Sequence, residues 1–211
     1  VKGRDHLTPN KEQFAHPFEG ETNFLEVVHQ LKPTVIIGVA GQPNVFTKAV
    51  IKAMATENDH PIIFALSNPT TKSECTAEEA YRWSGGKAIF ASGSPFDSVE
   101  FKGKTFYPGQ GNNAYIFPGL GLGIVISKAS RVVDEMLVIA AQTLGEMVSQ
   151  TDFNEGRLYP PLTNIREISL IIATAVAEYV FDNNLAQVPR PENIEQTIRA
   201  RAYLPEYISY V

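Results

Sequence analysis

The chain has 211 residues, and 18 Lys and Arg against 23 Asp and Glu give it a formal charge of −5. Charged residues make up 19% and hydrophobic residues 44%, which excludes a disordered chain and predicts a globular protein. Lys and Arg form no cluster, so we expect binding neither to nucleic acid nor to a membrane.

The first part of the chain alternates helical patterns with short apolar runs. Thr22 is expected to cap the first helix, and Thr76 with Glu79 forms a capping box before the third. We expect the apolar runs to be strands buried on both faces, as in a parallel sheet. The helices are predicted over 22–31, 46–57 and 76–84, and the strands over 34–40, 61–66 and 87–91.

The second part of the chain is predominantly helical. Gly, Pro and Asn dominate from about 101 to 123, after which helices are predicted over 124–148, 165–181 and 192–202. The expected buried stripe of the second of these helices is Ile168, Ile171, Ile172, Ala175 and Val176. The pattern predicts an α/β fold, with part of a doubly wound, Rossmann-like parallel sheet over 1–123. A helical extension over 124–211 is expected to pack on it.

Three loops are candidates for binding a ligand. Right-handed crossovers bring every loop that follows a parallel strand to one edge of the sheet, where ligands bind. Here those loops are 41–44, 67–70 and 92–95, all small and polar. The Asn68 amide both donates and accepts hydrogen bonds, and Pro69 restricts its backbone. These residue types also shape simple turns, and that alternative stays open.

Two glycine-rich stretches follow. Residues 109–114 match GxGxxA formally, but Pro108 precedes them and no hydrophobic strand does, so we reject a dinucleotide fingerprint. Asn112 and Asn113 remain as amides that either contact a ligand or brace the loop. The glycines of 119–123 are expected to let a helix pack closely against the sheet.

Other catalytic chemistry is sparse in this sequence. The four histidines are scattered, so we expect no metal site built by this chain alone. Cys75 precedes a helix cap that favours a thiolate, yet it lacks a base and is interpreted as a bystander. A single cysteine indicates a reducing compartment, and no signal peptide or membrane span is recognisable. Because the sequence starts with Val1, we expect it to begin inside a longer protein.

Six motifs, in order along nearly the whole chain, resemble the malic enzymes, and they correspond to the C-terminal NAD(P)-binding region of that family. They are KGR at 2–4, IIGVAGQ at 36–42, FALSNPT at 64–70, ASGSPF at 91–96, PGQGNN at 108–113 and GRLYPP at 156–161. The resemblance implies oxidative decarboxylation of L-malate to pyruvate and CO2, with reduction of NAD or NADP and a divalent Mg or Mn.

The resemblance also assigns roles to residues. Asn68 and Asn112 would hold the malate, with Asn68 also touching the cofactor. The nicotinamide half would lie along Val39, Ala40, Leu66 and Asn113, and Arg4 would lie near the phosphates. Lys11 is near the place where NADP-using relatives carry a lysine for the 2′-phosphate. The choice between NAD and NADP stays open.

The departures from the family pattern are equally informative. The family's acid–base tyrosine and lysine, its metal carboxylates and its GxGxxG fingerprint would all precede Val1, so we expect 1–211 to be inactive alone. The resemblance implies a homodimer or homotetramer of the full protein, in the cytoplasm or an organellar matrix. Two alternatives are a non-catalytic nucleotide-binding or assembly module of the same fold, and a malic-type region fused to a phosphate acetyltransferase.

Overall fold

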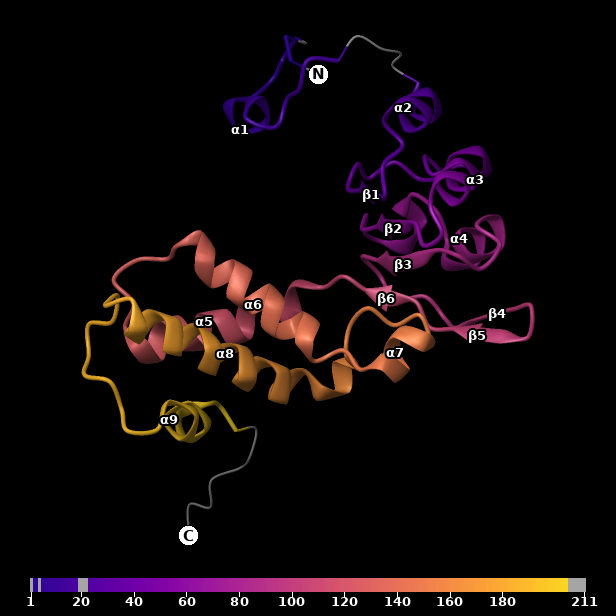
Figure 1. Ribbon diagram of the computed structural model, residues 1–211. Coiled ribbons are helices and arrows are strands. Elements are labelled where there is room, and N and C mark those ends of the chain that lie inside the picture. Colours follow the sequence, from indigo (N-terminus) through magenta and orange to yellow (C-terminus); the bar gives the residue numbers. More distant parts are fainter. Residues whose placement is uncertain (1, 4, 19–22, 205–211) are drawn as a thin grey trace.

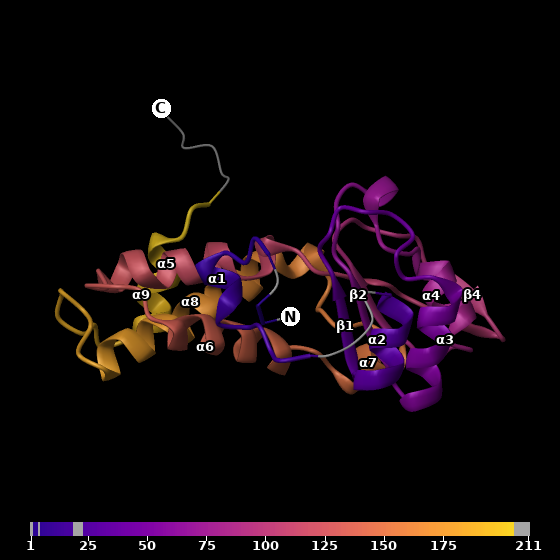
Figure 2. The ribbon, with the colours of Figure 1, turned by 90° about the horizontal axis from the view of Figure 1, so that it is seen from above.

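The structure, a computed structural model, describes residues 2–3, 5–18 and 23–204 and consists of a sheet-containing half and a helical half (Figures 1 and 2). The expected cap Thr22 lies outside the described residues. Helix α2 is capped instead by Asn23, whose Oδ1 accepts from the Leu25 N–H at 2.9 Å. The capping box of Thr76 and Glu79 is present with both of its bonds.

A four-stranded parallel sheet forms the centre of the first half, in the order β1-β2-β3-β6. The predicted α/β class with a partial parallel sheet is therefore confirmed. The sequence missed β6 and the β4–β5 hairpin, because two- and three-residue strands carry no periodicity. The elements are α1 (Pro9–Glu12), α2 (Phe24–Leu31), β1 (Val35–Gly38), α3 (Lys48–Glu57), β2 (Ile62–Ala65), η1 (Thr70–Lys72), α4 (Ala77–Trp83), β3 (Ile89–Ser92), β4 (Val99–Phe101), β5 (Lys104–Phe106) and β6 (Gly109–Gln110).

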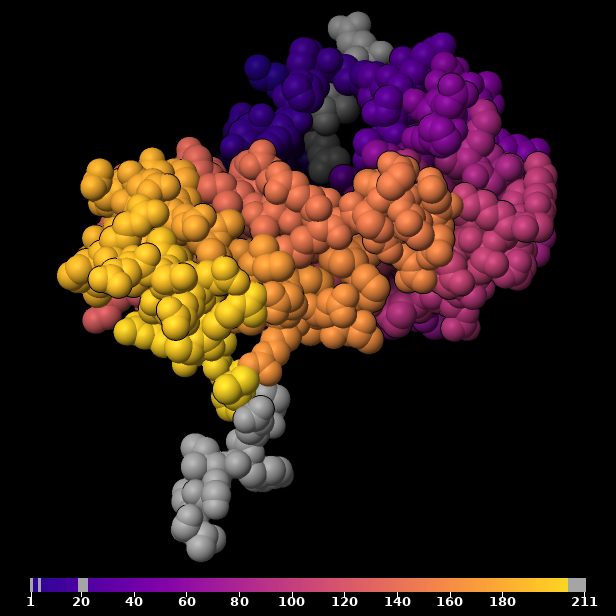
Figure 3. All heavy atoms as spheres, turned by 60° about the horizontal axis from the view of Figure 1, so that its bottom comes forward, coloured from indigo at the N-terminus to yellow at the C-terminus, as the bar shows by residue number. Residues whose placement is uncertain are grey.

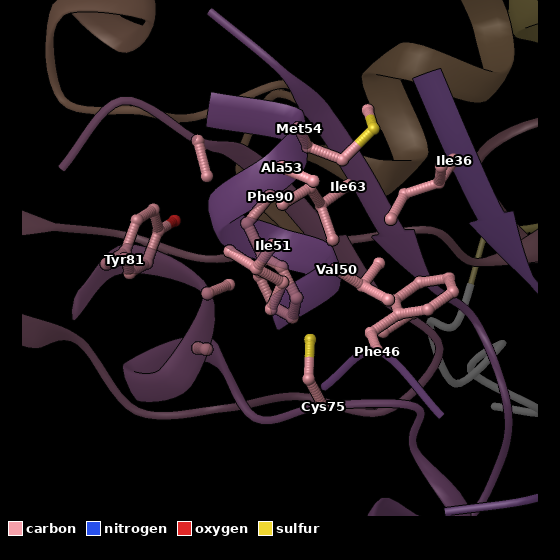
Figure 4. Close-up of a cluster of buried hydrophobic side chains, with 14 of the residues drawn as sticks. Ile36, Phe46, Val50, Ile51, Ala53, Met54, Ile63, Cys75, Tyr81 and Phe90 are labelled. Carbon is pink, nitrogen blue, oxygen red and sulfur yellow. The ribbon is translucent and has the colours of Figure 1, made fainter. Parts of the chain in front are cut away.

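The main apolar core lies between α3, α4 and one face of this sheet. Figure 4 shows Ile51, Met54 and Ile63 meeting there, and each is 0% exposed. Cys75 belongs to the same cluster. Burial raises the pKa of its thiol, and the carboxylates of Glu79 and Glu74 add to the rise. The helix-cap position of Cys75 therefore does not produce a thiolate.

The expectation that the first strand is buried on both faces was wrong. In β1 the side chain of Ile36 is buried against the helices, whereas Ile37 is 59% exposed and Val35 is 38% exposed. The strand lies at the edge of the sheet, and α3 and α4 cover only the face that Ile36 shares. An uninterrupted apolar run does not reveal which of its residues will be covered.

The second half is built around one long helix, α8, which α5, α6 and α9 surround (Figure 1). In Figure 3 the orange surface near α7 adjoins the magenta surface of the strands. There the Tyr107 N–H donates to the Glu155 carbonyl at 3.2 Å. The elements are η2 (Asn113–Tyr115), α5 (Phe117–Ser127), α6 (Asp134–Glu146), α7 (Gln150–Asn154), η3 (Leu162–Asn164), α8 (Ile165–Asp182) and α9 (Ile194–Arg201).

Two helical predictions were wrong in detail. The single helix expected over 124–148 is divided, because Lys128 ends α5 in a left-handed conformation and the chain turns back, so that α5 and α6 both pack on α8. In α8, Ile171 is 40% exposed, while Leu170 and Ala173 are buried toward α9. A helix enclosed on two sides has a wider apolar stripe than the one expected. The predicted domain boundary at residue 123 falls inside α5 and stays a prediction.

The glycines of α5 serve a contact other than the expected one. A Cβ added to Gly119 would lie 2.7 Å from Ile172 Cβ, and one on Gly123 would lie 2.7 Å from the Ala173 carbonyl oxygen. Both partners belong to α8, so the close packing is between helices and not against the sheet. None of the helices in the described part of the chain is long and apolar enough to cross a membrane.

Two alanine substitutions in α5 separate helix propensity from packing. Gly119→Ala is expected to lower the free energy of unfolding by about 1–3 kcal/mol, because the added methyl overpacks against α8. Gly121→Ala, whose Cβ would meet nothing within 4 Å, is expected to raise it by up to about 1 kcal/mol. Urea unfolding of the intact protein checks both, and equal effects of the two substitutions would contradict the packing.

Candidate binding site at the sheet edge

The carboxyl ends of the four strands lie in one row. Gly38 pairs with Ala65, Ala65 with Ser92, and Ser92 with Gln110. The loops after these strands therefore start side by side, as the right-handed connections lead one to expect. Ligands of open parallel sheets bind outside this edge. The structure thus brings together the three loops that the sequence indicated, and adds a fourth after β6.

A buried carboxylate joins the first two loops. Oε1 of Glu74 accepts from the Ala40 N–H at 3.2 Å and from the Ser67 hydroxyl. The Ser67 Oγ in turn accepts from the Gly41 N–H at 2.9 Å. Glu74 is 0% exposed. The sequence did not indicate this residue, because no periodic pattern marks a carboxylate whose partners are backbone groups distant in sequence.

Asn68 lies at the exposed end of the second loop. Its Oδ1 accepts from the Ser94 hydroxyl, which links the loops after β2 and β3. The peptide bond between Asn68 and Pro69 is cis. Gly93 is needed beside it, since a Cβ there would overlap the backbone carbonyl oxygen of Leu66 and would also lie 2.7 Å from Asn68 Nδ2. The amide is thus directed by its neighbours and also reaches the surface.

A cleft of about 380 Å³ opens next to this edge. Leu66, Asn112 and Asn113 line it together with apolar side chains of α5 and α6. Its size is within the range of small-molecule sites. Asn112 Oδ1 accepts from the Ala114 N–H at 2.9 Å and caps η2, so this residue does brace the loop while it faces the cleft.

Two tyrosines that the sequence did not single out complete the cleft. Tyr115 and Tyr159 stack with ring centroids 5.3 Å apart, and the Tyr115 hydroxyl donates to the Pro160 carbonyl at 2.7 Å. Burial, and to a smaller extent the Tyr159 phenol, raises the pKa of Tyr115 to about 12. Burial also raises the pKa of Tyr159. Both side chains are neutral at physiological pH.

The remaining predicted site residues lie in different places. Val39, which is 74% exposed, and Ala40 follow β1 on the same sheet edge. Lys11 is exposed on α1, which lies apart from β1 in both ribbon views (Figures 1 and 2). Arg4 lies outside the described residues. Within 2–3, 5–18 and 23–204, no three His, Cys, Asp or Glu side chains are grouped to hold a metal ion.

Residues 1–181 match a family model described as "Malic enzyme, NAD binding domain". The chain belongs to the malic enzyme family. An NADP-dependent malic enzyme of Vitis vinifera is 54% identical over 208 residues, which cover 98% of this chain and 35% of the relative. A mitochondrial NADP-dependent malic enzyme of Homo sapiens is 48% identical over 212 residues, covering 100% of this chain and 35% of the relative.

The fold agrees with the malic enzyme family. The crystal structure of a malic enzyme from Pyrococcus horikoshii matches with a TM-score of 0.59 and 27% identity, over 79% of this chain and 34% of that chain. The chain thus spans about a third of the length of the relatives it matches. The resemblance that the six motifs indicated is confirmed.

Two Tyr→Phe substitutions test the hydrogen bonding of buried tyrosines, with Tyr115 in the cleft and Tyr81 in the main core. Tyr115→Phe removes a buried bond to Pro160 and is expected to lower the free energy of unfolding by about 1 kcal/mol or more. Tyr81 is buried too, but among the described residues its hydroxyl has no hydrogen-bond partner. Tyr81→Phe should therefore leave stability unchanged or raise it. Unfolding in urea measures both, and a larger loss for Tyr81→Phe would show that the assignment is wrong.

Proposed function

We propose that the protein containing this chain is a malic enzyme that oxidises L-malate to pyruvate and CO2 with reduction of NADP. The family match over residues 1–181 carries the proposal. The two relatives described above, which cover nearly the whole chain, are named NADP-dependent, which favours NADP over NAD. Because the chain spans about a third of these relatives, the activity is proposed for the whole protein.

In this proposal the chain supplies one wall of the active site. The nicotinamide half of NADP lies along Val39, Ala40, Leu66 and Asn113. In support, Val39 and Ala40 are exposed at the end of β1, and Leu66 and Asn113 line the neighbouring cleft. The bound cofactor accepts the hydride that leaves C2 of malate. The apolar side chains of the cleft exclude water from that transfer.

The amides of Asn68 and Asn112 are proposed to hold malate. An amide NH2 group donates hydrogen bonds to the carboxylates and the amide oxygen accepts from the hydroxyl, so both ends of the substrate can be recognised. Asn68 is oriented by Ser94, and Asn112 by its bond to the Ala114 N–H. This prior orientation reduces the conformational entropy that is lost on binding.

Other parts of the proposal lie outside these loops. On the family resemblance, the ligands of Mg or Mn and the acid–base tyrosine and lysine are proposed to lie elsewhere in the full protein. Lys11 is proposed to face the 2′-phosphate of NADP and Arg4 the other phosphates. The oligomer is proposed to be a dimer or tetramer. A cytoplasmic location is proposed, although the human relative is named mitochondrial.

Asn112→Ala tests the substrate role in the intact protein. It is expected to raise the KM for malate roughly tenfold or more, because a ligand carboxylate loses a partner in a partly desolvated site. Steady-state rates of malate-dependent NADP and NAD reduction measure this effect and the cofactor preference of the unmodified protein.

Asn193→Ala is the matched control. Asn193 caps α9 by accepting from the Gln196 N–H at 2.8 Å. The Asn193→Ala variant therefore loses the same kind of cap as Asn112→Ala, but at a helix that does not line the cleft. Its kinetics should stay those of the unmodified protein. Unchanged malate KM and kcat in Asn112→Ala would remove Asn112 from the site. Absence of malate-dependent reduction in the unmodified protein would favour the non-catalytic alternative.

A further inference from the structure

Glu74 is a buried carboxylate that the proposed reaction does not use. It is 0% exposed, and in the described part of the chain no Lys, Arg or His forms an ion pair with it. Burying a charge is costly unless hydrogen bonds compensate for the lost water. The donors that compensate here are the Ala40 N–H, the Ser67 hydroxyl and the Ser67 N–H at 3.4 Å. All of them belong to the loops after β1 and β2.

The surrounding backbone is adapted to this side chain. A Cβ on Gly38 would lie 2.8 Å from Glu74 Oε2, so only glycine at the end of β1 leaves room for the carboxylate. The carbonyl of Glu74 accepts from the Phe46 N–H at 3.0 Å, at the far end of the same loop. Glu74 therefore holds both ends of residues 39–46 and the start of the loop that carries Asn68.

We propose that Glu74 is a positioning residue for the cofactor and substrate loops. Its carboxylate fixes the backbone of Ala40 and, through the Ser67 hydroxyl, that of Gly41, beside the proposed nicotinamide position. Because Ser67 directly precedes Asn68, the same carboxylate sets the position of the malate-binding amide. The inference rests on the proposed function, which gives these two loops their ligands.

Glu74→Gln in the intact protein is the direct test. In the unmodified protein each oxygen of the Glu74 carboxylate accepts a hydrogen bond. In the variant, the NH2 group of glutamine must therefore face a donor and push one loop away. The dissociation constant of NADPH, measured from its fluorescence, is expected to rise roughly tenfold or more, and the malate KM with it. A purely structural role would lower the thermal midpoint without changing the affinity of the folded protein.

Glu79→Gln is the matched control, because Glu79 undergoes the same chemical change on the same segment. Its carboxylate accepts from the Thr76 N–H at 2.9 Å in the capping box. Among the described residues it forms no hydrogen bond or ion pair with either strand-edge loop. Glutamine also serves in a capping box, so NADPH affinity should stay unchanged.

Ser67→Ala keeps the test decisive if Glu74→Gln does not fold. It removes the hydroxyl that links Glu74 to the Gly41 N–H, and the dissociation constant of NADPH is expected to rise about fivefold. Folded Glu74→Gln or Ser67→Ala protein that binds NADPH within about twofold of the unmodified protein would overturn the proposal. NADPH binding is measured without turnover, so a failure of the positioning role is distinguishable from an absence of malate oxidation.

Discussion

The parallel register of the sheet places Gly38, Ala65, Ser92 and Gln110 in one row, and the candidate site depends on that row. Each strand end starts a loop, so the loops begin side by side. Backbone alignment alone would leave them free to move independently. The buried Glu74 carboxylate removes that freedom for the first two loops, and the contact between Ser94 and Asn68 does so for the next pair.

The helical half completes the site from the other side. Because glycines let α5 pack closely on α8, the N-terminal end of α5 and the preceding η2 are held next to the sheet edge. Residues after α7 return to the same place, where Tyr159 stacks on Tyr115. The cleft is thus formed by segments that are close in space and distant in sequence, and the two halves contribute to it together.

Much of the fold could be predicted from the sequence because its local signals agree with its tertiary structure. The capping box at Thr76, the three apolar strands and the loops after them were found from spacing alone. Contacts without a local signal were missed. The turn at Lys128 reflects packing on α8, and the exposure of Ile37 reflects a sheet face that α3 and α4 do not cover. Glu74 is held by groups of two other loops. The roles of Asn68 and Asn112 came from family resemblance.

Ligands are proposed to bind at the carboxyl edge of the sheet. Hydrogen exchange of the intact protein, with and without NADP and malate, tests it most directly, because amides that a ligand covers exchange more slowly. Binding at this edge predicts protection over residues 39–44, 66–70 and 111–116, and unchanged exchange at the opposite edge, over 58–61 and 85–88. Protection at the opposite edge with none over 39–44, 66–70 and 111–116 would contradict binding at the carboxyl edge.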